Sequence, residues 1–194
     1  MPTKTREFLA KFRTVLKARA KFRNFDPSGS EWHGLYSVLQ PTFSRYKVVW
    51  REMALGIIAA AVGTADMPAG EGRKIVIPDH KLFLVPCESE EEADFVAGML
   101  NSSVINLLVA SYAVSTGIST HILSRVPLPK FRNEDSTHRD IATSAKAIRK
   151  ILASEKHTSV EVSKLNLAVG RLLGLDPATV NYTVSALKDF GIQG

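Results

Sequence analysis

Hydroxyl side chains and one histidine gather between residues 111 and 124, a stretch that contains no acidic residue. Its polar members are Ser111, Ser115, Thr116, Ser119, Thr120, His121 and Ser124. Three interpretations fit these residue types. They are a hydroxyl nucleophile with a histidine base, a surface that binds a ligand through hydrogen bonds, and a turn between two elements.

A hydrolase would use Ser115 or Ser119 as its nucleophile and His121 as its base. Ser119 and His121 are two residues apart, so an extended segment would place both side chains on one face. However, no orienting carboxylate lies nearby, and the members of a catalytic triad are normally distant in sequence. Hydroxyls without acidic neighbours are better matched to phosphate oxygens or base edges, which carboxylates would repel. We therefore interpret Ser115, Thr116, Ser119, Thr120 and His121 as ligand-binding, with a small hydrolase using His121 as an alternative.

Other catalytic and nucleotide-binding motifs are absent from the sequence. It contains no GxxxxGK[ST] loop, no GxGxxG after a strand, no GxSxG and no HExxH. The five histidines are scattered singly, and Cys87 is the one cysteine, which excludes an intrachain disulfide and a cysteine-rich zinc site. We expect this segment to bind neither a metal nor a cofactor.

Positive charge is concentrated at the start of the chain. Residues 1 to 25 contain eight basic residues and Glu7 as the one acidic residue, whereas the whole chain has a net charge of +6. Such a segment favours binding to a polyanion, because neutralised phosphates release their counterions. The candidates for phosphate contact are Lys11, Arg13, Lys17, Lys21 and Arg23. A solvated helix face is the alternative.

Two further groups of basic residues accompany expected strands. Arg45, Lys47 and Arg51 would share one strand face by alternation, with Val48 and Trp50 on the other. Trp50 is expected in the core. Lys74, His80 and Lys81 flank an expected hairpin turn that would reach a DNA groove or face solvent. These two groups complete the candidate DNA-binding residues.

The elements that would position these residues follow from periodicity and turn signals. The spacing of apolar residues predicts an amphipathic helix over 5–23, and residues 26–30 predict a loop. Strands are expected over 35–40 and 46–62, the second broken near Met53. Residues 63–72 form a connection. Residues 74–86 then predict a strand, a Pro-Asp turn and another strand.

The second half is predicted to be mainly helical. Ser89 caps a helix with Glu92 as its capping-box partner, and Asn101 and Ser102 mark a place where that helix packs closely on the sheet. Residues 125–131 are extended by two prolines, and a long helix covers 137–153. Two shorter helices follow over 159–173 and 176–190, the last capped by Asp176 with Pro177 in its first turn. The predicted fold is α+β: a twisted, mostly antiparallel sheet flanked by helices, with a helical C-terminal part.

No apolar run approaches the roughly 18–20 residues that span a bilayer. The N-terminus also lacks the continuous apolar segment of a secretory signal. We therefore expect no membrane partner and a cytoplasmic location.

Several segments, taken in order, resemble the C-terminal target-recognition region of adenine-N6-specific DNA methyltransferases, especially type IIG-like restriction–modification enzymes. The segments are FSRYKVVWRE (43–52), KIVIPDHKLFLVP (74–86), SEEEADFVAGMLNSS (89–103), STGIST (115–120) with RVPLPKF (125–131), and LNLAVGRLLGLDPATVNYTVSAL (165–187). The resemblance implies a basic connecting helix and loop over 1–30, a target-recognition core over 31–135, and C-terminal helices over 136–194. It also implies double-stranded DNA as the partner.

The family's catalytic parts are not in these residues. Its members carry an upstream methyltransferase domain with an AdoMet loop and an Asn-Pro-Pro-aromatic motif, and this sequence contains no Pro-Pro pair. The resemblance therefore implies a covalently linked methyltransferase domain that holds AdoMet, and no methylation by this segment alone. It leaves open whether the parent protein also cleaves DNA. The remaining alternative is a protein–protein interaction module of a specificity subunit without direct DNA readout.

Overall fold

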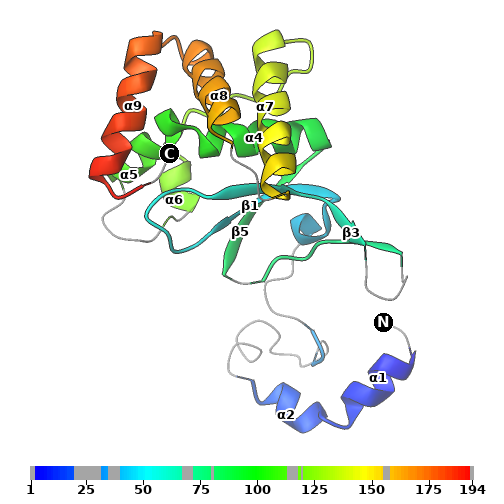
Figure 1. The fold of residues 1–194 in the computed structure, drawn as a ribbon. Helices are drawn as coiled ribbons and strands as arrows, with labels where there is room; N and C mark the ends of the chain where they lie inside the picture. Colours follow the sequence, from blue (N-terminus) through cyan, green and yellow to red (C-terminus); the bar gives the residue numbers. More distant parts are fainter. Residues whose placement is uncertain are drawn as a thin grey trace. The chain divides into compact units, whose positions relative to one another are not determined.

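The computed structural model describes residues 3–19, 32–34, 40–66, 72–79, 81–112, 118, 120–154 and 158–192, and Figure 1 shows its fold. The chain divides into two compact units, residues 1–40 and 41–194. Lys21, Arg23, His80, Ser115, Thr116 and Ser119 lie outside the described residues, as does most of the strand expected over 35–40.

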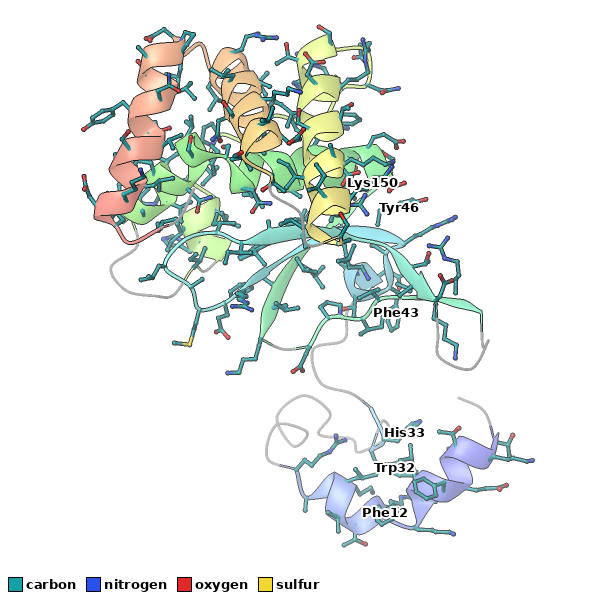
Figure 2. All side chains as sticks on the ribbon, viewed as in Figure 1. Phe12, Trp32, His33, Phe43, Tyr46 and Lys150 are labelled. Carbon is teal, nitrogen blue, oxygen red and sulfur yellow. The ribbon has the colours of Figure 1, made fainter. Side chains whose placement is uncertain are left out.

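The first unit contains two short helices, α1 (Thr3–Ala10) and α2 (Arg13–Lys17). The helix expected over 5–23 is therefore broken. At the break, the backbone N–H groups of Lys11 and Phe12 donate to carbonyls three residues back, which tightens the turn and ends α1. The Phe8 and Phe12 rings meet edge to face at 5.6 Å, and the Arg13 guanidinium lies 5.5 Å from the Trp32 ring centroid. Figure 2 labels Phe12 and Trp32 in this unit.

The second unit is built on a three-stranded antiparallel sheet with the order β2-β1-β5. Its strands are β1 (Tyr46–Arg51), β2 (Ala59–Val62) and β5 (Leu82–Cys87). A separate antiparallel pair joins β3 (Thr64–Asp66) to β4 (Arg73–Ile75), and the 3-10 helix η1 (Gln40–Phe43) precedes β1. The predicted break near Met53 is confirmed, because residues 52–58 separate β1 from β2.

The hairpin expected across residues 74–86 is wrong. The two predicted strands exist as β4 and β5, but β4 pairs with β3 and β5 pairs with β1. The Ala65–Lys74 and Thr64–Ile75 pairs place β4 beside the residues that follow β2. Lys74 therefore lies in one sheet, whereas Lys81 directly precedes a strand of the other.

Helices cover one face of the three-stranded sheet (Figure 1). The first is α4 (Glu90–Asn101), and Ser89 caps it as predicted. The capping box is only partly formed, because the Glu92 carboxylate bonds to the N–H of Glu88 rather than to that of Ser89. The Glu92 N–H donates to Ser89 Oγ at 3.0 Å, while the Glu92 carboxylate accepts from the Glu88 N–H at 2.6 Å. Val48 and Trp50 of β1 pack beneath α4 in the core, as predicted for Trp50, whose indole stacks on Phe83.

Asparagine amides complete the backbone hydrogen bonds where regular structure stops. The Asn101 amide both donates to the Ala59 carbonyl and accepts from the Ala59 N–H, at 2.8 and 2.9 Å. Asn106 accepts from the Ile57 N–H at 2.7 Å, in the break between β1 and β2. Asn106 belongs to α5 (Ser103–Tyr112). These bonds confirm that Asn101 marks close packing of helix on sheet.

Three longer helices follow in the described C-terminal part: α7 (Ser136–Leu152), α8 (Ser159–Leu172) and α9 (Pro177–Asp189). Asp176 caps α9 and Pro177 is its first residue, as predicted. Phe95 and Met99 of α4 form one apolar cluster with Ile141 of α7 and Leu165 and Val169 of α8. The sheet and the C-terminal helices therefore share α4 as a common support, and the predicted α+β class is confirmed.

None of the described helices alone is both long and apolar enough to cross a membrane. Together α4 and α5 reach the required length and composition, but they are bent by 59° at the break between them.

Candidate nucleic-acid interface

The hydroxyl-rich stretch is anchored beside one end of the three-stranded sheet. The Ile118 N–H donates to the Glu52 carbonyl at 2.9 Å, and the Ile118 side chain is fully buried in the core. The short helix α6 (Thr120–Leu123) follows, and its Ile122 and Leu123 pack against the same core. On the flanks of the stretch, the Arg125 guanidinium lies 5.6 Å from the Tyr112 ring centroid. These contacts fix where the stretch meets the sheet.

Two predicted basic residues lie at this same end of the sheet. Arg51 is the last residue of β1 and pairs with Leu82, the first residue of β5. Lys81 precedes Leu82, and its carbonyl accepts from the Glu52 N–H at 3.1 Å. Arg51 and Lys81 are both exposed, as is His121 on α6, whereas Glu52 is half-buried. The structure thus brings Arg51, Lys81 and the start of α6 together.

Lys47 does not belong to this exposed group, and its predicted DNA contact conflicts with its position. Its side chain is fully buried, and its ammonium donates to the carbonyls of Thr42 and Val76 at 2.7 and 2.8 Å. The predicted alternation of side chains along β1 is confirmed, because Lys47 lies on the face opposite Val48 and Trp50. That face is nevertheless covered near Lys47 by η1 and by the segment after β4. Burial lowers the pKa of the Lys47 ammonium.

Arg45 lies at the opposite end of β1 from Arg51. Arg45 directly precedes the six-residue strand that Arg51 ends, so the two backbone positions are roughly 20 Å apart. The Arg45 guanidinium lies 5.3 Å from the Tyr46 ring centroid. Lys74 is exposed on β4, in the separate strand pair. The exposed basic residues predicted in this unit therefore do not form one continuous face. Arg51 and Lys81 lie at one end of the three-stranded sheet, and Arg45 and Lys74 lie elsewhere.

The first unit has basic residues of its own. Lys11, Arg13 and Lys17 are exposed along α1, α2 and the turn between them. Arg13 also contacts the Trp32 ring, so its stem is held in place. Both phosphate contact and the alternative of a solvated helix face require this exposure, so the predicted phosphate contact stays a prediction.

The hydroxyls that the structure describes in the stretch bond to their own backbone. Ser111 Oγ donates to the Leu108 carbonyl and Ser124 Oγ donates to the His121 carbonyl, both at 2.7 Å. Among the residues placed by the structure, no hydrogen bond or ion pair joins the His121 ring to a carboxylate. The described part of the chain thus supplies no orienting group for a histidine base.

Sequence reasoning missed an apolar groove of about 760 Å³ in the second unit. Residues 53–58 line it together with parts of α4, α7, α8 and the segment after α9. Met53, Leu55, Ile58 and Leu152 on its walls are more than half exposed, and Arg51 lies among the lining residues. The signal in the sequence was the apolar run after Met53, which was interpreted as strand because its residues are typical of strands.

It also missed Arg73 and Arg149, which line a smaller pocket with Arg45. Arg149 makes a two-pronged ion pair with the buried carboxylate of Asp94, with distances of 3.1 and 3.0 Å, and reaches Glu90 at 2.9 Å. The residues come from three distant parts of the sequence, so no local motif joins them.

Comparisons with known proteins add no family to these observations. No protein-family model matches this chain, and no curated protein matches it either.

Proposed function

We propose that this chain is the sequence-specific DNA-recognition domain of a restriction–modification adenine-N6 DNA methyltransferase. The observation that carries the proposal is the Ile118–Glu52 hydrogen bond. It joins the hydroxyl-rich stretch to the sheet end that presents Arg51 and Lys81. Cationic side chains bind backbone phosphates, and hydroxyls can bond to phosphates and to base edges, so these residue types together suit duplex DNA.

The two kinds of side chain would have different tasks. Arg51 and Lys81 are suited to backbone phosphates, which give affinity and orientation without sequence information. His121 and the hydroxyls of residues 115–120 are suited to base edges, where Ser and Thr can bond to several bases. Arg51 can also pair with guanine in the major groove. The exposed cations of the first unit, Lys11, Arg13 and Lys17, would add phosphate contacts.

In this proposal the recognition domain positions a linked catalytic domain on the target site. That domain would hold AdoMet and flip the target adenine out of the duplex, because chemistry on a base requires it outside the stack. The present chain would bind DNA without methylating it. Its place would be the cytoplasm of the cell that carries the restriction–modification system.

The proposal predicts a salt dependence that specific residues control. Binding of a labelled duplex pool, followed by fluorescence anisotropy, should weaken linearly on a logarithmic plot against salt. Arg51→Ala and Lys81→Ala should each reduce the magnitude of the slope by about 0.9, the contribution of one phosphate contact. Lys164→Ala is the matched control, because Lys164 is exposed on α8, away from the sheet end.

Affinity that is absent, or that does not change with salt, would contradict DNA binding. If the duplex binds but the Arg51→Ala, Lys81→Ala double variant keeps the wild-type slope, the sheet end is not the interface.

A second candidate is a protein-interaction module, and the apolar groove favours it. Exposed apolar side chains such as Met53, Leu55, Ile58 and Leu152 gather there, and such patches commonly mark protein interfaces. The two candidates make opposite predictions for the anisotropy experiment, since a module without DNA readout gives no salt-dependent duplex binding.

A further inference from the structure

The second pocket of the unit has a different character from the apolar groove. It encloses about 200 Å³, below the roughly 300–1,000 Å³ typical of drug-sized ligands. The polar side chains that line it are Arg45, Tyr46, Thr64, Arg73, Glu90 and Arg149. Three guanidinium groups therefore border a space that suits a small anion.

The three arginines come from separate elements, and each is held by a different contact. Arg149 of α7 is fixed by its ion pair with the buried Asp94. Arg45, just before β1, lies over the Tyr46 ring, and Figure 2 shows Tyr46 at this end of the sheet, close to the C-terminal half of α7 in the view. Arg73 of β4 donates to the Thr64 carbonyl at 3.3 Å. The cations are thus partly ordered before any ligand binds, which reduces the entropy lost on binding.

The carboxylates near the pocket do not neutralise all of this charge. Glu90 is the carboxylate in its lining, and it is shared between Arg149 and Lys146, at 2.9 and 3.4 Å. Asp66 pairs with Arg73 at 3.4 Å, but both side chains are largely exposed, so water screens the pair. Arg45 makes no ion pair with any carboxylate that the structure describes. The Arg45 guanidinium is therefore available to bind an anion.

We infer that this pocket binds a phosphate group of the DNA backbone, with Arg45 and Arg73 as its main contacts and Arg149 as a fixed positive wall. Guanidinium groups match phosphate oxygens geometrically and can donate two parallel hydrogen bonds. The inference rests on the proposed function for the source of the phosphate. It adds a contact point at the opposite end of β1 from Arg51, roughly 20 Å away.

The first arm of the test uses inorganic phosphate as the probe. The arginine Nε–H signals of the full chain are followed by NMR while phosphate is added at constant ionic strength. The signals of Arg45 and Arg73 should shift and saturate. The Nε–H signal of Arg149, which lines the same pocket, should shift with them in the wild type and stay unchanged in the Arg45→Ala, Arg73→Ala double variant. Arg149 is not replaced in this experiment, because its loss would leave the buried Asp94 carboxylate without its partner and destabilise the fold.

The second arm measures duplex binding by anisotropy. Arg45→Ala or Arg73→Ala should reduce the magnitude of the salt slope by about 0.9, because one phosphate contact is lost. Lys150→Ala is the control. Lys150 is exposed, is labelled in Figure 2 and follows Arg149 directly, but it does not line the pocket.

The outcomes separate the pocket from the wider function. Phosphate shifts together with a reduced slope support the inference. Duplex binding with an unchanged slope in the double variant and no phosphate shifts overturns the pocket but leaves the proposed function standing. Phosphate shifts without any duplex binding overturn DNA as the source and show a site for free phosphate instead.

Discussion

Replacing Lys47 by alanine is expected to lower the free energy of unfolding by about 3 kcal/mol, because two partly buried carbonyls lose their donor and the fully buried side chain leaves a cavity. The acceptors are the carbonyls of Thr42 and Val76, which come from η1 and from the segment after β4. Lys47 thus ties both segments to β1. The Lys47 ammonium is buried and has no carboxylate partner among the described residues, which itself costs stability. This cost offsets part of the loss, so the net effect is smaller than the sum of the two contributions.

Urea denaturation measures this effect, and the salt slope of duplex binding is expected to stay unchanged while the variant is folded. Lys164→Ala serves as the control, since exposed substitutions usually change stability by less than about 0.5 kcal/mol. Normal stability combined with weaker duplex binding would show that Lys47 reaches DNA after all.

The same residue predicts a dependence on pH. Burial holds the pKa of the Lys47 ammonium below its usual value of 10.5. In the window between the folded-state pKa and 10.5, the unfolded chain binds more protons than the folded protein, so the unfolding free energy rises with pH. Lys47→Ala lacks this rise. The stability difference between wild type and variant should therefore grow as the pH approaches 10.5.

Replacing Arg149 by methionine is expected to lower the free energy of unfolding by about 3 kcal/mol, because a buried carboxylate loses its partner. The Asp94 side chain is 2% exposed and Arg149 holds both of its oxygens, whereas the Arg149 side chain is 41% exposed. The exposure of Arg149 places the effect at the lower end of the range for buried pairs. Arg171→Met is the matched control, since its pair with Asp140 is exposed on both sides.

The loss in Arg149→Met should be larger near pH 8 than near pH 4. Burial raises the pKa of Asp94 above its usual 3.8, and the Arg149 hydrogen bond acts in the opposite direction. Without Arg149 that pKa rises further, so ionising Asp94 destabilises the fold more as pH rises. Glu90 also makes the stability difference between wild type and Arg149→Met larger at high pH. Its pKa lies below the usual 4.5 mainly through its hydrogen bond with Arg149, and the stability that this gives wild type is present above pH 4.5.

Thermal or urea denaturation at both pH values checks this prediction. If the loss of stability were equal at the two pH values, the Arg149–Asp94 pair would stabilise the fold through packing rather than through its charges.

The parts of the fold that depend on local chemistry could be predicted from the sequence. Ser89 and Asp176 cap their helices because the bond from a side-chain oxygen to an N–H three residues on requires only near neighbours. The break near Met53 could also be predicted from the local sequence. The hydrogen bond that satisfies the Ile57 N–H in this break could not, because its acceptor is Asn106 on a distant helix.

The candidate site was predicted less well, since exposure depends on non-local pairing. Alternation placed Lys47 and Arg51 on one face of β1, but it could not show that η1 covers only the Lys47 end. The pairing of β4 with β3 likewise removed Lys74 from the neighbourhood of Lys81. The position of Ile118 beside Glu52 joins residues far apart in the sequence, and only the three-dimensional fold shows it.

The most direct measurement of the central claim is a map of amide chemical shifts during titration with a short DNA duplex. We predict that the largest changes in the described part of residues 41–194 fall at Arg51, Glu52, Lys81, Ile118, Thr120 and His121, and that these changes weaken with added salt. Changes that concentrate instead along the apolar groove, at residues 53–58 and Leu152, or the absence of any salt-dependent change, would contradict it.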